Sequence, residues 1–178
     1  MKNRTALFAV IAFLSTFLLS FKTEESKIKW LSLEEAYAKT QKEPRKILVD
    51  VYTGWCGWCK VMDKNTFTNA QVSSYVNQKF YAVKFDAESR ADIKIGTMVY
   101  KFDEKAKVHQ AAMALMNSQM SYPTIVFLDE KMNMIQPVPG FREAKDFHKL
   151  ISWFGGDYHK KEAFDTYTAG TYPKLFPK

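Results

Sequence analysis

The fold of this chain is decided by residues 46–60, which read KILVDVYTGWCGWCK. The first part, residues 46–52, is an apolar and largely β-branched run of strand length, the pattern of a central strand buried on both faces. Asp50 is the exception inside this run. The second part contains Cys56 and Cys59, and the residues after them predict a helix from about residue 56 to residue 65. The stretch therefore predicts a buried strand that leads directly into a helix, with both cysteines at the N-terminus of that helix.

The spacing of the cysteine pair allows three interpretations. A structural disulfide across two residues would constrain the unfolded chain very little. A tetrahedral zinc site would need two further ligands. Besides carboxylates, the sequence offers His109, His148 and His159, which are far apart and fall in segments that we expect to be helical. We therefore expect a redox pair and no metal ion, with a metal-binding pair as an alternative.

The position of the two cysteines on the predicted helix separates their roles. Disulfide exchange requires a thiolate, and an ordinary thiol with a pKa of about 8.5 is mostly protonated at neutral pH. The free N–H groups and the positive dipole end of a helix N-terminus stabilise an anion. We therefore expect Cys56 to be the attacking nucleophile and Cys59, about one turn inside the helix, to be the resolving thiol. Asp50, desolvated in its strand, is the expected proton acceptor.

The rest of the chain supplies alternating helices and strands. Ser32 and Glu35 form a capping box that starts a helix ending before Pro44. Pro137 and Pro139 place the last strand at a sheet edge. The other expected elements are strands at 80–85, 122–128 and 134–138, and helices after Asn69, over 89–120 and around 147–154. This order predicts an α/β sandwich with a mixed sheet.

Two segments extend this pattern. Residues 89–120 are expected to be a helical stretch, because apolar residues recur there at helical spacing. Residues 157–178 are expected to form a short helical extension and a polar tail. The apolar stripe of the first segment is interpreted as core packing, and its members are Val108, Ala111, Ala112, Leu115 and Met116.

A resemblance is carried by three parts of the sequence: Val49–Lys60, Tyr122-Pro-Thr124 at the start of a hairpin, and Gly140 before the last helix. Together they resemble the thioredoxin-fold thiol-disulfide oxidoreductases. The segment Cys59–Phe67, with the export predicted below, is most similar to exported thioredoxin-like proteins of the DsbD periplasmic-domain type. The resemblance implies a thioredoxin-like three-layer α/β sandwich over residues 30–156. A central mixed sheet and a helical insertion, about residues 89–120, before the cis-proline strand belong to this expectation.

The resemblance also implies roles for residues around the cysteines. It implies a cis bond between Tyr122 and Pro123 that faces the cysteines and leaves the Tyr122 backbone free to pair with a substrate strand. It gives the proton-acceptor role to Asp50 as well. Trp55 and Trp58 are expected beside the substrate groove, and Trp58 departs from thioredoxin, which has proline between the cysteines. We expect no cofactor.

The N-terminus predicts export. Lys2 and Arg4 precede an uncharged, apolar run at residues 6–21, which is the pattern of a signal peptide. The run is slightly shorter than the ~20 residues of a typical membrane-spanning helix. Because small residues are scarce at the expected cleavage site, an uncleaved N-terminal anchor over residues 1–21 is the alternative. A polar linker, residues 22–29, leads to a domain that we expect in the periplasm or another extracytoplasmic compartment.

Composition limits the partners. The 178 residues, 47% of them hydrophobic, suffice for one buried core and one domain. The net charge of +7 comes from dispersed lysines without arginine and aromatic clustering, so we expect no nucleic-acid partner. The expected partners of a monomer are protein disulfides and a thiol electron donor. A reducing role is favoured, because no histidine between the cysteines stabilises a reduced thiolate. A non-catalytic binding module is the alternative.

Overall fold

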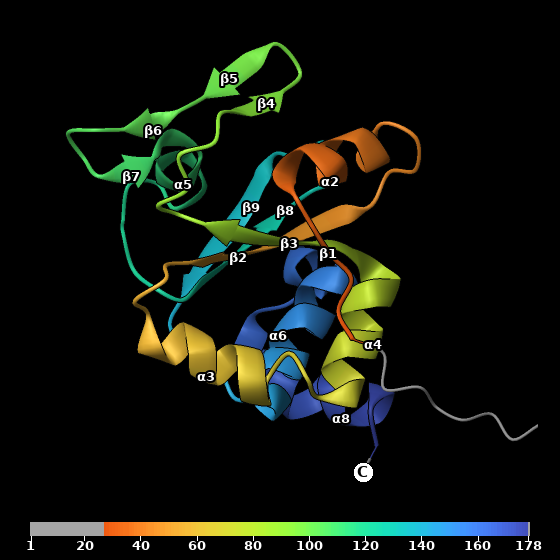
Figure 1. Ribbon diagram of the computed structural model, residues 1–178. Helices are drawn as coiled ribbons and strands as arrows, with labels where there is room; N and C mark the ends of the chain where they lie inside the picture. Colours follow the sequence, from red (N-terminus) through yellow and green to blue (C-terminus); the bar gives the residue numbers. More distant parts are fainter. Residues whose placement is uncertain (1–26, 178) are drawn as a thin grey trace, which may run out of the picture.

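The computed structural model describes residues 27–177, whose main sheet has five strands with helices on both faces (Figure 1). The central strand, β2 (Lys46–Tyr52), runs parallel to β3 (Phe80–Asp86) and antiparallel to β8 (Thr124–Leu128). The edges are β1 (Trp30–Leu31), beside β3, and β9 (Met134–Pro139), beside β8. The predicted mixed sheet is confirmed, and the strand with the two prolines is an edge strand.

Alternate side chains of β2 enter two separate cores on opposite faces of the sheet. Val49 packs on the face that carries α2 (Leu33–Thr40), while Leu48 packs on the other face. Because side chains alternate along a strand, Asp50 points to the same face as Leu48. The helices that cover that face are α3 (Gly57–Asn65), α4 (Ala70–Lys79) and α6 (Ala144–Gly155). The buried carboxyl group of Asp50 therefore lies on the face of the sheet that α3 covers, and α3 is the helix that begins at the cysteines.

The starts of three helices follow their capping residues. Ser32 and Glu35 form the predicted capping box at α2. The side chain of Asn69 accepts hydrogen bonds from the first-turn amides of α4. Cys56 is the N-cap of α3, so the cysteine pair begins the helix as the sequence indicates. These caps satisfy amide groups that a helix N-terminus otherwise leaves without partners.

The predicted helical insertion at 89–120 is wrong for most of its length. Two small hairpins occupy its first part, and only α5 (Gln110–Leu115) is helical. Gly96 and Lys107 adopt left-handed conformations, with φ of 61° and 56°, at the turns that reverse the chain. A helix cannot contain such reversals. The hairpins are formed by β4 (Ile93–Ile95) with β5 (Met98–Tyr100), and β6 (Phe102–Asp103) with β7 (Val108–His109).

The apolar stripe of this segment is buried as expected, although its first member belongs to a strand. Val108 lies in β7, and the helical spacing holds only from Ala111 onward. His109 is not helical: it ends β7 and caps α5, where its Nδ1 accepts a hydrogen bond from the Ala111 amide at 3.1 Å. The sequence pattern therefore predicted that these apolar side chains are buried, but it did not predict the backbone conformation of the segment.

The C-terminal segment forms a series of short helical turns instead of one helix and a polar tail. Tyr167 is fully buried and donates a hydrogen bond to the Ser152 hydroxyl of α6 at 2.8 Å. Lys46 of β2 binds Asp157 at 3.0 Å and Glu130 at 2.9 Å, which fastens the start of the segment to the sheet. The turns are η2 (Tyr158–Lys160), α7 (Phe164–Thr166), η3 (Tyr167–Thr171) and α8 (Tyr172–Leu175).

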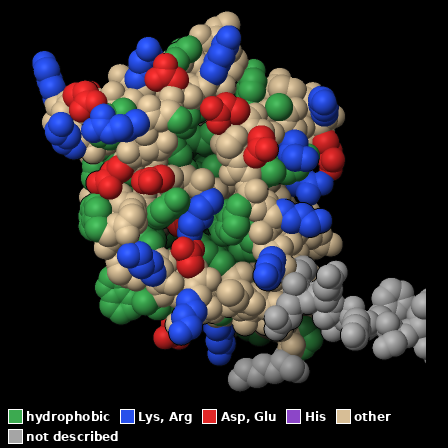
Figure 2. Space-filling view, in the orientation of Figure 1, with side chains coloured by type: hydrophobic (Ala, Val, Ile, Leu, Met, Phe, Trp, Pro, Cys, Tyr) green, Lys and Arg blue, Asp and Glu red, His purple; other side chains and the backbone are tan. Residues whose placement is uncertain are grey.

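The predicted export segment, residues 1–21, lies outside the described residues. Within residues 27–177, no helix has both the length and the apolar character needed to cross a membrane. Figure 2 shows lysine and arginine side chains scattered over one face among acidic ones, in agreement with a dispersed basic surface.

Candidate active site at the start of α3

Cys56 and Cys59 form a disulfide at the first turn of α3, with their Cα atoms 5.3 Å apart. The chain enters this turn directly from β2, and the Cys56 amide donates to the Thr53 carbonyl at 3.2 Å. Both cysteines are nearly buried, at 4% and 2% exposed, so exposure does not distinguish them. Their positions on the helix do, because Cys56 is the N-cap and Cys59 lies inside the helix.

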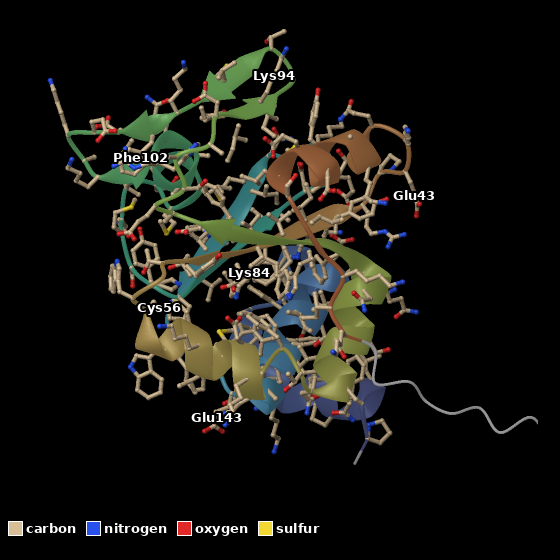
Figure 3. All side chains as sticks on the ribbon, in the orientation of Figure 1. Glu43, Cys56, Lys84, Lys94, Phe102 and Glu143 are labelled. Atoms are coloured by element: carbon tan, nitrogen blue, oxygen red, sulfur yellow. A yellow bond between two sulfur atoms is a disulfide. The ribbon has the colours of Figure 1, made fainter. Side chains whose placement is uncertain are left out.

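The first turn of α3 directs a hydrogen-bond donor at one sulfur. The backbone N–H of Cys59 donates to Sγ of Cys56 at 3.1 Å. Such a donor, added to the positive end of the helix dipole, favours negative charge on that sulfur over the other. The geometry therefore places this donor and the positive end of the helix at Cys56 and not at Cys59. Figure 3 shows Cys56 where the chain enters α3 from the sheet.

Asp50 is buried behind this turn, with 1% of its surface exposed. Desolvation raises the pKa of Asp50 to about 6, although the Lys84 ammonium opposes the rise and the Asp63 carboxylate adds to it. Oδ2 of Asp50 accepts from Lys84 Nζ at 2.5 Å, whereas Oδ1 has no hydrogen-bond partner within residues 27–177. A carboxyl group with this pKa can take up a proton and release it near neutral pH.

Lys84 is a site residue that the sequence reasoning missed. It lies opposite Asp50 in the register of β2 and β3, and its ammonium binds both Asp50 and Asp63 of α3. The rings of Tyr52 and Phe67 face the same ammonium at 4.8 and 5.2 Å, distances at which a ring attracts a cation. A lysine inside an apolar strand was the available signal, but only the register between the two strands pairs it with Asp50.

Two aromatic pairs lie near the disulfide. Trp55, 67% exposed, packs edge-on against Tyr122 with ring centres 5.8 Å apart. Trp58, 61% exposed, packs against Phe141 at 5.2 Å. Phe141 was also missed, because its only signal is its place directly after Gly140. The two tryptophans are thus exposed apolar side chains next to the cysteines in the sequence, each packed on a different aromatic ring.

The expected cis bond joins Tyr122 to Pro123. The next residue, Thr124, pairs with Val51 of β2, so the bond lies at the end of the sheet from which the chain passes to the cysteines. The Pro123 carbonyl accepts from the Gly140 amide at 2.8 Å. Tyr122 and Pro123 therefore lie at the same end of the sheet as the cysteine turn.

The histidines lie in other parts of the fold. His109 caps α5, His148 donates to or accepts from Tyr172 at 2.9 Å, and His159 packs against Trp153 and Phe154. In the described part of the chain, no three or more histidine, cysteine or acidic side chains are grouped so as to hold a metal ion. The cysteines are joined to each other instead.

Solved structures share this fold. A structure titled DsbH Oxidoreductase has a TM-score of 0.54 at 14% identity, over 76% of this chain and 90% of that one. A putative disulphide-isomerase from Bacteroides thetaiotaomicron has a TM-score of 0.53 at 24% identity, over 76% and 94% of the two chains. At these identities the comparison establishes the fold, and the thioredoxin-like prediction is confirmed.

Among curated proteins, Spermatogenesis-associated protein 20 of Homo sapiens is 33% identical over 60 residues, 34% of this chain. The chain spans only 8% to 12% of the length of the first curated relatives that it matches. The family model Thioredox_DsbH, described as a protein of unknown function, DUF255, matches residues 9–147. Fold and cysteine pair together support a thiol–disulfide redox enzyme in general terms, and the chain belongs to the Thioredox_DsbH family.

Proposed function

We propose that the protein is an exported thiol-disulfide oxidoreductase that exchanges disulfides with protein substrates and works as a reductant. The observation that carries the proposal is the Cys56–Cys59 disulfide at the N-terminus of α3, with the buried Asp50 on the side of the sheet that this helix covers. A merely structural disulfide would require neither the donor aimed at Cys56 nor a carboxyl group with a raised pKa behind it.

The reaction follows from these positions. The Cys56 thiolate attacks one sulfur of a substrate disulfide, so the substrate S–S bond breaks and a mixed disulfide forms. Asp50 accepts the proton of the Cys59 thiol, and the resulting thiolate attacks Sγ of Cys56. The substrate leaves with two thiols after protonation, and the Cys56–Cys59 disulfide remains. A thiol electron donor must then return two electrons to this disulfide.

The surface around the disulfide favours an extended polypeptide as substrate. Trp55 and Trp58 offer apolar contact, and no backbone hydrogen bond joins Tyr122 to another part of residues 27–177. A free N–H and C=O beside the reacting sulfurs can pair with a substrate backbone, as an added strand does. A small charged disulfide would find little to bind in these side chains.

Export and the direction of electron transfer belong to the same proposal. The basic and apolar N-terminus supports an extracytoplasmic location, either after cleavage or with the segment retained as an anchor. Trp58 places neither a charge nor a titratable proton between the cysteines, so this dipeptide does not add the stabilisation of the reduced form that a strong oxidant requires. A measured reduction potential of about −270 mV would support a reductant, and one of about −120 mV would contradict it.

Insulin reduction with dithiothreitol tests the activity. The wild-type chain should accelerate precipitation of the insulin chains, and Cys56→Ser should abolish the acceleration. Cys59→Ser should retain the first attack and accumulate mixed disulfides that non-reducing electrophoresis detects. Ser74→Ala, on α4, serves as the matched control and should behave as the wild type. Full activity of Cys56→Ser would refute the proposal, and a bound partner without any mixed disulfide would favour a binding module.

A further inference from the structure

A cavity of about 890 Å³ lies between α4, α6 and α8. This volume is within the range of small-molecule sites. None of its lining residues belongs to α3 or to the cysteine turn. Figure 1 shows α8 beside the other two helices, so the C-terminal segment forms one wall of the cavity.

One wall of the cavity is aromatic. The ring of His148 lies 4.8 Å from that of Phe176 and 5.4 Å from that of Tyr75, and Tyr172 packs against Phe176 at 5.1 Å. All four side chains line the cavity. They present ring edges and faces on which a planar apolar group can pack.

The charged groups of the cavity are cations. Lys145 and Lys149 of α6 line it, and no aspartate or glutamate of residues 27–177 does so. Lys149 forms an ion pair with Asp146 at 2.7 Å, whereas Lys145 has no ion-pair partner in the described part of the chain. Lys145 lies in the first turn of α6, where the helix dipole adds positive potential, and Lys149 lies one turn further along.

His148 connects the two parts of the cavity. It is only 6% exposed, and its one hydrogen bond within residues 27–177 joins Nδ1 to the Tyr172 hydroxyl, which leaves Nε2 without a protein partner. Burial lowers the pKa of His148 and raises the pKa of Tyr75 to about 12, so both rings are uncharged at neutral pH. The positive charge of the site therefore comes from the two lysines alone.

We propose that this cavity binds a small aromatic anion, whose ring packs on Tyr75, His148 and Phe176 and whose carboxylate, phosphate or sulfonate binds Lys145 and Lys149. A neutral aromatic compound would leave the two lysines unused, and a free phosphate ion would leave the aromatic wall exposed. The combination of an acid-free lining, an unpaired cation and a buried imidazole selects a ligand that has both features. The site is independent of the cysteine chemistry.

Two probes that differ by one charged group test the proposal. The ¹⁵N-labelled full chain is titrated with 8-anilinonaphthalene-1-sulfonate and with N-phenyl-1-naphthylamine, which has a similar aromatic body and no sulfonate. Saturable shifts of amides at residues 69–78, 144–149 and 168–177 and of the His148 imidazole are expected with the sulfonate. The affinity for the uncharged compound should be lower by a factor of about ten or more.

Charge removal supplies the second arm of this test. The double variant Lys145→Gln, Lys149→Gln should lose about tenfold in affinity for the sulfonate. Lys64→Gln on α3 removes a lysine outside the cavity and should bind as the wild type does. The ¹⁵N spectrum itself verifies that each variant is folded. Equal affinity for the two compounds, an unchanged double variant, or shifts confined to the residues around Trp55 and Trp58 would each overturn the proposal.

Discussion

Lys84 and Lys46 lie on neighbouring strands, and each binds two carboxylates. The two clusters differ in which partner is buried, the acid or the lysine. At Lys84 the buried member is the acid Asp50, while at Lys46 the buried member is the lysine, 7% exposed. The half-exposed partners of Lys46 are Glu130 and Asp157. Whichever group is removed from water bears the larger desolvation cost.

The reversal gives the two clusters opposite titration behaviour. Burial raises the pKa of Asp50 despite its lysine. Partial burial also acts to raise the pKa of Glu130 and of Asp157, but hydrogen bonds from Lys46, and for Asp157 also from Lys160, outweigh it and lower both. The first cluster holds a carboxyl group that titrates near neutral pH, and the second holds carboxylates that remain ionised. One set of side chains thus suits proton transfer, and the other suits a structural ion pair.

Asp50→Asn should produce the largest effect, because it removes the proposed proton acceptor. The rate at which Cys59 resolves a mixed disulfide should fall about 100-fold, while the first attack by Cys56 is retained. Stopped-flow tryptophan fluorescence with a model peptide disulfide would separate the two steps. Lys46→Met, which alters only the other cluster, should leave both rates unchanged. An unaltered resolving rate in Asp50→Asn would remove Asp50 from the mechanism.

The same substitution should stabilise the fold. The pKa of Asp50 is about 6 in the folded chain against 3.8 for the ordinary group, so the folded state binds this proton more tightly than the unfolded state. Stability is therefore lost as the pH rises from about 4 to 6, and above that range the ionised group costs about 1–3 kcal/mol. Urea unfolding from pH 4 to pH 8 should show this loss in the wild type and not in Asp50→Asn.

Lys46→Met should destabilise the fold by about 1–2 kcal/mol, because two carboxylates lose the cation between them. Since the pKa values of Glu130 and Asp157 are lowered in the folded chain, their stabilisation is present above the ordinary carboxyl pKa and lost as the pH falls through the folded values. The variant should therefore show a weaker loss of stability in acid. Insulin reduction should be unaffected, and a parallel loss of activity would show that the clusters are coupled.

Asp63→Asn should have the smallest effect. Its carboxylate raises the pKa of Asp50 and competes for Lys84, so its removal should lower the pKa of Asp50. The midpoint of the pH profile of the resolving step should move toward acid, with the plateau rate retained. A shift toward alkaline pH would show that Asp63 acts on Asp50 in another way. Glu104→Gln, at an exposed hairpin position away from the site, is the control.

The sequence predicted those features that depend on local pattern. The apolar run around Asp50 was sufficient to identify β2, because a strand buried on both faces carries few polar residues. The position of the cysteines at the start of α3 followed from the direct succession of strand and helix. Hairpins around Gly96 could not be predicted, since they depend on single residues with left-handed backbone conformation. Lys84 and Phe141 were missed because only the register of the strands and the packing of separate loops bring them to the cysteines.

The edge strands of the main sheet limit how another polypeptide can pair with this protein. β1 has two residues, and β9 contains Pro137 and Pro139, which lack backbone N–H groups at alternate positions. Neither edge can template the addition of a long strand, so neither invites aggregation. The proposed reductant would have to contact exposed strands of its protein substrates without adding them to its own sheet. In the proposed reaction the backbone contact is confined to Tyr122, beside the disulfide, and it ends when the substrate thiols leave.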